Sequence, residues 1–485
     1  MKSKSLVLLT ILLAGLTPVA HAGDSTPLNC TQLMAWLVGG ISNIRLSQLV
    51  EQRGLAFIPG DKSMEALRQA GANAAWLEVA QKARTASGTE ANCSLGLARA
   101  AELVRAKHYD QAERQLRDLL YGDGENAAVH FALGNILKQQ EKWEDAFDEF
   151  TESARLMPDL PETHSRMASF FFHSDDPENT VAEARTALSL DPRNAEAYKY
   201  LGLGLSANGH FDAALHAFQE SLERQPDNPE VFYDMGMTLR DKGDLAGAAT
   251  AFRKATALNP AYWEAHTNLG LVLHDQHKYL EAIAEYQQAK KLAPEEPAVR
   301  NNLGSTYCDK GDYDAAIAEF RELFRVRPDW QSGHNCVAKA LMAKHDYAGA
   351  IAELHLAVGQ NPTGATEHRV LGQALLLTGK NEEAVRELRK AVSLNLDSAL
   401  GHHYLAVALG ELKDYSAAAA EHREAVRLEP TASNHYYLAA CLINMGAYDE
   451  ALAELETAAR MDPAQSLYRA RKDELLKIMK TQDLR

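Results

Sequence analysis

Basic residues, cysteines and long apolar runs are all scarce in this chain of 485 residues. There are 50 Lys and Arg against 66 Asp and Glu, which gives a formal net charge of −16 at pH 7. A chain this acidic lacks the positive surface that binds phosphate backbones, so nucleic acid and anionic lipid surfaces are poor partners. After residue 22 no apolar run is long enough to cross a bilayer, which argues against membrane insertion of a mature chain.

Catalytic and cofactor-binding motifs are missing as well. The sequence contains no G-x-S-x-G, no phosphate-binding loop, no H-E-x-x-H and no C-x-x-C. These short patterns position nucleophiles, phosphates, zinc ions or redox-active thiols. We therefore expect a protein that is not an enzyme and that uses no cofactor and no metal ion.

The start of the chain has the layout of a secretory signal peptide. Two lysines precede an apolar run over residues 6–16, and residues 20–22 read Ala-His-Ala, the small-x-small pattern of a cleavage site. Cleavage after Ala22 predicts an exported protein, periplasmic or extracellular in a bacterium. Removing the two lysines makes its net charge about −18.

Proline, by contrast, follows a strict period. It recurs at an unbroken interval of 34 residues, at Pro158, Pro192, Pro226, Pro260, Pro294, Pro328 and Pro362. Leu396 takes the next place, and Pro430 and Pro463 continue the phase with one residue lost between them. A fixed period of this length is typical of stacked repeats, in which each unit buries its apolar face only against its neighbours. The phase defines about eleven units, which are 93–126, 127–160, 161–194, 195–228, 229–262, 263–296, 297–330, 331–364, 365–398, 399–431 and 432–465.

Each unit repeats a pattern of small and large apolar residues. Leu-Gly fills the seventh and eighth places of four units, Ala fills the twentieth place of nine, and an aromatic residue or leucine usually follows four residues later. Small residues at a crossing let two antiparallel helices approach closely, while the large ones fill the gaps around them. A glycine such as Gly209 or Gly243 stands between the two expected helices, where it permits the left-handed conformation that ends a helix.

This pattern resembles the tetratricopeptide repeat family over nearly all of residues 93–465. The resemblance implies an all-α fold, a right-handed α-solenoid of about eleven helix-turn-helix repeats. We accordingly divide the chain into a signal peptide (1–22), an N-terminal helical module (23–92), the repeat array (93–465) and a C-terminal capping helix (466–485).

One repeat departs from the pattern, and a separate segment precedes the array. Unit 161–194 reads FFFHSDDP where its neighbours have a short glycine turn, which predicts a displaced helix junction. Residues 30–86 contain four short apolar patterns separated by glycine and proline, which predicts a compact helical module. This module either caps the apolar end of the solenoid or holds a partner of its own. A cryptic enzyme activity within it is the alternative outside the binding class.

The five cysteines leave few pairing options. Cys30 and Cys93 bracket the N-terminal module, and an oxidising compartment invites a disulfide between them, although two unrelated thiols fit the sequence equally well. Cys308 and Cys336 lie in neighbouring units at places that differ by about 9 Å along the helix axis. Pairing between them is therefore not expected, and with Cys441 they are interpreted as core thiols.

Two rows of titratable residues recur in phase. Histidine fills the fourth place of seven units, where the resemblance implies a bulky aromatic residue, at His130, His164, His266, His334, His368, His402 and His435. Metal ligands must converge on one point, so we interpret this row as half-buried packing residues. Glutamate fills the second place of four successive units, at Glu162, Glu196, Glu230 and Glu264. That row either attracts a basic ligand or places acids at helix N-termini, where the helix dipole favours them, and we favour the second reading.

Candidate binding residues come from the resemblance, which implies a concave face built mainly from places 2, 5, 6, 9, 12 and 13 of each first helix. Three consecutive units offer amides there, at Asn268, Asn301, Asn302 and Asn335. Because an amide both donates and accepts, such a ladder can hold the backbone of an extended peptide; bonding to a neighbouring helix explains it equally well. The same face offers Lys199, Tyr200, Tyr233, Asp234 and Arg240 upstream. Near the C-terminus an aromatic cluster either extends the groove or packs between helices, and it consists of His403, Tyr404, Tyr436 and Tyr437.

These observations predict a non-catalytic exported scaffold or adaptor that binds proteins or extended peptides in a concave groove. The alternative within the same class is an assembly factor for envelope or secreted complexes, in which the choice of partner rather than the chemistry of the groove defines the role.

Overall fold

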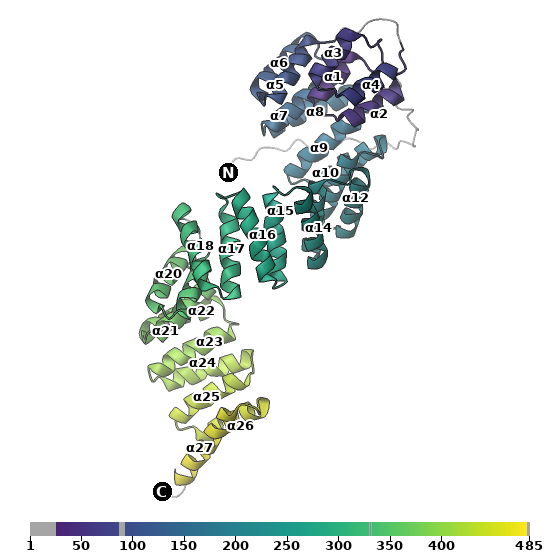
Figure 1. Ribbon diagram of the computed structural model, residues 1–485. Helices are drawn as coiled ribbons and strands as arrows, with labels where there is room; N and C mark the ends of the chain where they lie inside the picture. Colours follow the sequence, from purple (N-terminus) through teal and green to yellow (C-terminus); the bar gives the residue numbers. More distant parts are fainter. Residues whose placement is uncertain (1–25, 87–92, 329, 331, 483–485) are drawn as a thin grey trace, which may run out of the picture. The chain divides into compact units, whose positions relative to one another are not determined.

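The computed structural model describes residues 26–86, 93–328, 330 and 332–482 (Figure 1). Within these residues the chain is helical, with strand-like pairing limited to isolated bridges at Leu55, so the prediction of an all-α repeat solenoid is confirmed. None of the helices in this part of the chain combines the length and the apolar character that crossing a membrane requires. The predicted signal peptide, 1–22, lies outside the described residues. The chain divides into two compact units, unit 1 ending at Leu258 and unit 2 beginning at Asn259.

Four short helices form the N-terminal module of unit 1: α1 (Cys30–Val38), α2 (Asn43–Arg53), α3 (Asp61–Ala70) and α4 (Ala74–Lys82). α1 begins with a capping box, in which the side chains of Asn29 and Gln32 accept each other's backbone N–H. Trp36 and Trp76 are fully buried in the core of the module. A disulfide joins Cys30 to Cys93 and thereby ties α1 to the residues that lead into the first repeat.

Helix pairs follow in both units. Within the described residues, unit 1 contains five pairs: α5 (Leu95–Arg105) with α6 (Tyr109–Gly122), α7 (Ala127–Gln139) with α8 (Trp143–Leu156), α9 (Pro161–His173) with α10 (Pro177–Leu190), α11 (Ala195–Ala207) with α12 (Phe211–Arg224), and α13 (Pro229–Lys242) with α14 (Leu245–Leu258). The described part of unit 2 contains six pairs and a final helix: α15 (Trp263–Asp275) with α16 (Tyr279–Leu292), α17 (Pro297–Lys310) with α18 (Tyr313–Val326), α19 (His334–Ala343) with α20 (Tyr347–Gln360), α21 (Ala365–Leu377) with α22 (Asn381–Leu394), α23 (Ala399–Glu411) with α24 (Tyr415–Leu428), α25 (Ala432–Asn444) with α26 (Tyr448–Met461), and α27 (Ser466–Gln482).

In six of the described pairs, the two helices meet at a glycine of the first helix and a large side chain of the second. A Cβ added at Gly236 would lie 2.6 Å from the ring of Phe252, which is fully buried. The same contact recurs between Gly202 and Phe218 and, in other pairs, at Gly134, Gly270, Gly304 and Gly372. The missing side chain lets the second helix approach closely, which is why this place carries glycine in so many units.

The turn between the helices of a pair always contains one residue with left-handed backbone. Five pairs use glycine at this place, whereas six use other residues, among them Asp175 (φ 56°) and Lys413 (φ 67°). Asp175 therefore closes the turn of unit 161–194, and α10 begins at the same place in its unit as the second helices of the neighbouring units. The prediction of a displaced junction was wrong, because the turn needs the left-handed conformation and does not strictly need glycine.

Replacing Lys413 by glycine is expected to stabilise unit 2 by about 1 kcal/mol, since a left-handed backbone strains every residue with a Cβ. The reverse substitution at the corresponding turn residue, Gly379→Ala at φ 74°, is expected to destabilise unit 2 by a similar amount. Urea unfolding followed by circular dichroism measures both; equal midpoints for the two variants would contradict this account of the turn.

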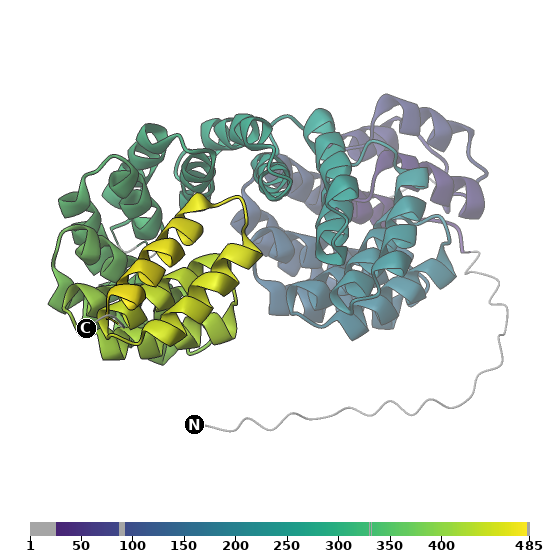
Figure 2. The same ribbon diagram turned by 90° about the horizontal axis from the view of Figure 1, so that it is seen from below.

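The first helices of successive pairs lie on the side toward which each stack curves. α9 packs on α11 in unit 1, and α17 packs on α19 and α21 on α23 in unit 2. A stack of helix pairs is concave on the side where neighbouring helices converge. Figure 2 shows the helices of unit 2, green to yellow, following one another along such a curved path. We call the surface formed by the first helices the inner face.

Candidate protein-interaction surface

The N-terminal module lies on the inner face of the first repeats. α1 packs against α5 and α7, and α3 packs against α5; in Figure 1 these purple helices lie beside the blue ones of the first repeats. A Cβ at Gly39, just after α1, would lie 2.8 Å from the ring of Phe131 on α7. Module and first repeats share one hydrophobic core, so the module covers the inner face there as well as closing the end of the stack.

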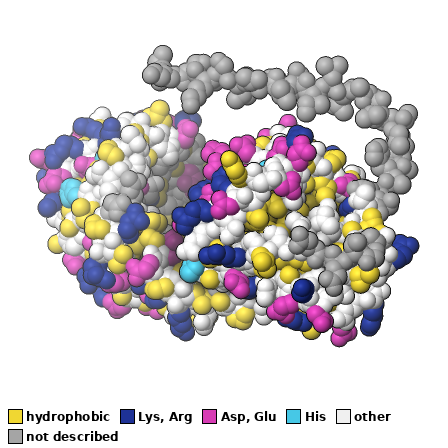
Figure 3. All heavy atoms as spheres, turned by 90° about the horizontal axis from the view of Figure 1, so that it is seen from above, with side chains coloured by type: hydrophobic (Ala, Val, Ile, Leu, Met, Phe, Trp, Pro, Cys, Tyr) yellow, Lys and Arg dark blue, Asp and Glu magenta, His cyan; other side chains and the backbone are white. Residues whose placement is uncertain are grey.

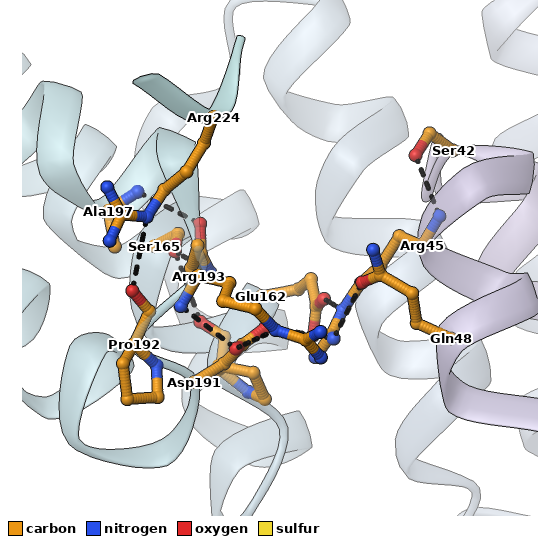
Figure 4. A network of polar contacts seen from close by, with 12 residues as sticks. Ser42, Arg45, Gln48, Glu162, Ser165, Asp191, Pro192, Arg193, Ala197 and Arg224 are labelled. Carbon is orange, nitrogen blue, oxygen red and sulfur yellow. Dashed lines mark hydrogen bonds and ion pairs between the residues drawn. The ribbon is translucent and has the colours of Figure 1, made fainter. Parts of the chain in front are cut away.

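Arg45 of α2 extends this contact to the third repeat (Figure 4). Its guanidinium donates to Glu162 at the start of α9 and pairs with Asp191, whose Oδ2 lies 2.8 Å from Nη1. All three side chains are largely buried. The other carboxylate oxygen of Glu162, Oε2, is buried without a hydrogen-bond partner, so Arg45 supplies the charge compensation of this carboxylate. A cleft of about 320 Å³ lies beside the network.

The same kind of pairing continues along the inner face of unit 1. Arg166 of α9 pairs with Glu196 of α11, and Lys199 of α11 pairs with Glu230 of α13, with 2.9 Å between Nζ and Oε2. In each case a cation of one repeat meets the second-place glutamate of the next. The row of glutamates in unit 1 is thus neutralised within the chain, which argues against the reading that it attracts a basic ligand. All members of the row lie in the first turn of a helix, as the dipole interpretation expects.

The other residues expected on this face of unit 1 have different environments. Tyr200 is only 5% exposed and its hydroxyl donates to Ser169 at 2.9 Å, so its ring is part of the core and does not match the expected groove contact. Tyr233 is half-buried, with its ring 5.6 Å from that of Phe252. Arg240 lies at the end of α13, half-buried beside Asp241.

Asp234 is the most perturbed acid of this face. Burial raises its pKa to about 7, Lys199 opposes this rise and Glu230 adds to it. The carboxyl group therefore takes up a proton near neutral pH.

In unit 2 the predicted amides are half-buried on α15, α17 and α19. The oxygen Oδ1 of Asn301 accepts from Ser332 at 3.0 Å and from the Trp330 indole at 3.3 Å. Asn335 donates to Glu367 on α21, whereas its own Oδ1 is buried without a partner. Asn268 donates to a carbonyl of its own helix, and Asn302 accepts from Asn301. The structure thus brings these amides onto one face but engages part of their bonding capacity within the chain.

The aromatic cluster near the C-terminus is packed between helices. Tyr437 lies 4.8 Å from His403 and is stacked on His422 of α24, measured between ring centroids, and Tyr436 contacts Tyr468 of α27. His422 was missed from the sequence. It is 2% exposed, and Nδ1 of both His403 and His422 is buried without a hydrogen-bond partner. The packing reading therefore accounts for this cluster.

These two buried histidines make the last repeats sensitive to acid. Burial, together with repulsion from His403, lowers the pKa of His422 to about 3. Because the folded-state pKa lies below the unfolded value of about 6.5, the stabilisation is complete above pH 6.5 and is lost as the pH falls toward 3. Between pH 7.5 and 5, we expect the free energy of unfolding of the wild type to fall by about 2 kcal/mol more than that of His422→Leu. Urea unfolding at both pH values measures this difference, and identical pH dependence of the two proteins would contradict it.

The fourth-place histidines form a second, different set. In all seven, Nδ1 lies 2.5–2.8 Å from a glutamate oxygen of the paired helix, nineteen residues later. In five of them Nε2 also lies 3.1–3.3 Å from a backbone carbonyl six residues earlier. A carbonyl only accepts, so Nε2 must carry a proton, and the arrangement fits an imidazolium paired with a carboxylate. No group of three potential metal ligands occurs among the residues that the structure describes.

The pair of His266 with Glu285 is expected to weaken at alkaline pH. The hydrogen bond to Glu285 raises the pKa of His266, burial opposes it, and the charge of Glu285 adds to the rise. A folded-state pKa above the unfolded value means that the stabilisation is complete below about pH 6.5 and is lost as the pH rises through the folded-state pKa. His266→Gln should therefore be less stable than wild type by about 1 kcal/mol at pH 6 and by less at pH 8.5. A difference that grows with pH in thermal unfolding would contradict the ion pair.

Two spacings between charged residues in the sequence indicate these ion pairs. A cation followed 30 or 31 residues later by glutamate joins Arg166 to Glu196 and Lys199 to Glu230. This spacing is one repeat of 34 residues less four or three residues, which brings the two side chains together. Histidine followed by glutamate after nineteen residues joins the two helices of a pair. The contact of Arg45 with Glu162 has no such signal, since 117 residues separate the partners.

Comparison with known families agrees with this architecture. A tetratricopeptide repeat model matches residues 97–161, 233–297, 337–399 and 403–466, and two further tetratricopeptide repeat models match 273–340 and 195–228. Helix pairs stacked in register within each unit define a helical-repeat scaffold for protein interaction. The chain belongs to the tetratricopeptide repeat family, as its repeat pattern indicated.

Individual relatives are distant. Small glutamine-rich tetratricopeptide repeat-containing protein 2 of Mycosarcoma maydis is 26% identical over 92 residues, which are 19% of this chain and 26% of that protein. The chain thus spans about a quarter of the length of this relative. A tetratricopeptide repeat protein of Parabacteroides merdae (19% identity, 51% of this chain, 98% of that chain, TM-score 0.40) and PilF of Pseudomonas aeruginosa (19% identity, 46% of this chain, 99% of that chain, TM-score 0.39) are similar solved structures.

Proposed function

We propose that this protein is a non-catalytic, exported scaffold that binds proteins or extended peptides on the part of its inner face that the N-terminal module leaves uncovered. The placement of the module carries this proposal. Because α1 and α3 occupy the inner face at α5 and α7 and Arg45 reaches α9, the inner face begins to be available at α11. In unit 1 the uncovered surface is then formed by α11 and α13. Unit 2 offers a surface of its own, formed by its first helices.

The chemistry of this surface favours recognition of a polypeptide backbone over recognition of charge. The glutamates of unit 1 are paired within the chain. Elsewhere, too, charge is mixed: over the face that is seen from above in Figure 3, acidic and basic side chains are interspersed. The amides of α15, α17 and α19 lie on this surface, and at Asn335 the acceptor Oδ1 is without a hydrogen-bond partner. Amides bind the alternating N–H and C=O groups of an extended chain regardless of its sequence.

Affinity capture with the full chain tests the proposal. Bait proteins are wild type, the double variant Asn268→Ala/Asn302→Ala, and a matched outer-surface control, Gln288→Ala, whose side chain is exposed on α16. Loss of two amides is expected to lower the affinity for captured partners about tenfold. The control variant should capture the same partners as wild type does. Equal capture by all three baits, or no captured partner at all, would count against the proposal.

Export is part of the same proposal. The apolar N-terminal run supports it, and so does the Cys30–Cys93 disulfide, because such bonds persist in oxidising compartments. Fractionation followed by N-terminal sequencing tests it: a chain that begins at Gly23 outside the cytosol is expected, and an intact N-terminus in the cytosolic fraction would refute it.

A further inference from the structure

Two thiols meet on the inner face of unit 2, between α17 and α19. Cys308, near the end of α17, donates from its Sγ to the backbone carbonyl of Cys336 at 3.5 Å. Both cysteines are free in the structure. The sequence predicted that these two cysteines do not pair, and no disulfide joins them. They are nevertheless in contact, because the Cys308 side chain leans toward the start of its helix, whereas the Cys336 carbonyl points toward the end of α19.

The two thiol groups also act on one another. A hydrogen bond with the Cys336 thiol lowers the pKa of Cys308, burial opposes this effect, and the ammonium of Lys339 supports it. The same hydrogen bond and burial raise the pKa of Cys336. The first proton to leave the pair is therefore that of Cys308, and the Cys308 thiolate is stabilised by the neighbouring Cys336 thiol. Lys339 is held nearby through Asp309, with 3.6 Å between Nζ and Oδ1.

The two thiols differ in accessibility. Cys308 is 1% exposed, whereas Cys336 is half-buried. An approaching disulfide reagent thus reaches Cys336 first, and the buried Cys308 lies in contact with Cys336. One accessible thiol with a second one adjacent is the arrangement in which a mixed disulfide is quickly resolved within the chain.

We propose that Cys308 and Cys336 form a redox-active dithiol that closes to an intramolecular disulfide by exchange with a disulfide-bonded oxidant. Cys336 passes its thiol proton to the adjacent Cys308 thiolate as its sulfur attacks one sulfur of the oxidant, whose S–S bond breaks to release one thiol. The Cys308 thiolate then attacks Cys336 Sγ in the mixed disulfide and releases the second thiol. Two electrons pass to the oxidant, and the two protons of the cysteines end on the released thiols.

Closure would join the first helices of two successive repeats beside the amides of the proposed binding surface. Asn301 and Asn302 lie on α17 and Asn335 lies next to Cys336 on α19. The bond would fix the spacing of these two helices in the oxidised state. The chemistry itself does not rest on the proposed function.

Oxidised glutathione is the probe. The folded full chain, with Cys308 and Cys336 reduced, is equilibrated in buffers of varied glutathione ratio, quenched with acid, alkylated, digested without reduction and analysed by mass spectrometry. We expect a peptide cross-linked through Cys308 and Cys336, whose formation reverses in excess reduced glutathione. Cys308→Ser should trap Cys336 as its glutathione adduct, and the control Cys441→Ser should cross-link as wild type does.

Three results would overturn the proposal: a lasting glutathione adduct on Cys336 of wild type, no reaction at either thiol, or a cross-link that forms only in urea. Circular dichroism checks the folding of both variants. If Cys308→Ser does not fold, the cross-link in wild type decides the question on its own.

Discussion

Arg45→Ala is expected to loosen the N-terminal module from the inner face of unit 1 at a cost of about 3 kcal/mol, because removing one partner of a buried ion pair leaves its charge uncompensated. Here Glu162, whose second oxygen has no hydrogen-bond partner, loses its ion pair with Arg45, and Asp191 is left with Arg193 alone, at 3.8 Å between Nε and Oδ1. Hydrogen exchange measured by mass spectrometry locates the effect. Protection should fall in α2 and at the start of α9, while α15–α27 keep wild-type protection.

The matched control is Arg68→Ala. Arg68 pairs with Glu65 on α3, but both side chains are more than half exposed. Arg68→Ala should therefore lower the free energy of unfolding by less than about 1 kcal/mol. If Arg45→Ala changes exchange no more than Arg68→Ala does, the module is not held on the third repeat by this network.

Gly236→Val is expected to destabilise unit 1 by about 3 kcal/mol, at the upper end of the usual cost of overpacking a core. A Cβ at this place would lie 2.6–2.8 Å from three atoms of the Phe252 ring. That ring is fully buried and cannot turn aside without displacing α14. Phe252→Leu in the same chain should restore part of the loss, since the smaller side chain makes room, and a double-mutant cycle in urea measures the coupling.

Gly359→Ala is the control for this prediction, because nothing lies within 4 Å of a Cβ at Gly359. It should be neutral or slightly stabilising through helix propensity alone. Equal destabilisation by both substitutions, or additivity of Gly236→Val with Phe252→Leu, would show that the helix crossing is not closed by this contact.

The repeats were readable from the sequence because each of their contacts recurs. Gly236 against Phe252 is one instance of a pattern seen in several units, so period and residue type together identify both helices and their crossing. The turn of unit 161–194 was misread because glycine was taken as the signal, whereas Asp175 adopts the same backbone conformation.

The position of the module was not readable, because it depends on contacts that occur once. Gly39 meets Phe131, and Arg45 meets Glu162, across long stretches of sequence with no periodic counterpart. The contact of Cys308 with Cys336 also occurs only once, so the sequence did not predict it. It depends on the directions of one side chain and one carbonyl. The candidate amides were found as a set, but their bonds to Ser332 and Glu367 appear only once the helices are placed.

Site-specific photo-crosslinking in living cells tests most directly whether partners dock on the uncovered inner face. A photoreactive amino acid replaces Asn302 on the inner surface of α17 or, in a second strain, Gln288 on the outer surface of α16. The account predicts a discrete protein adduct from position 302 and none from position 288. Adducts from position 288 alone, or from neither position, would contradict it.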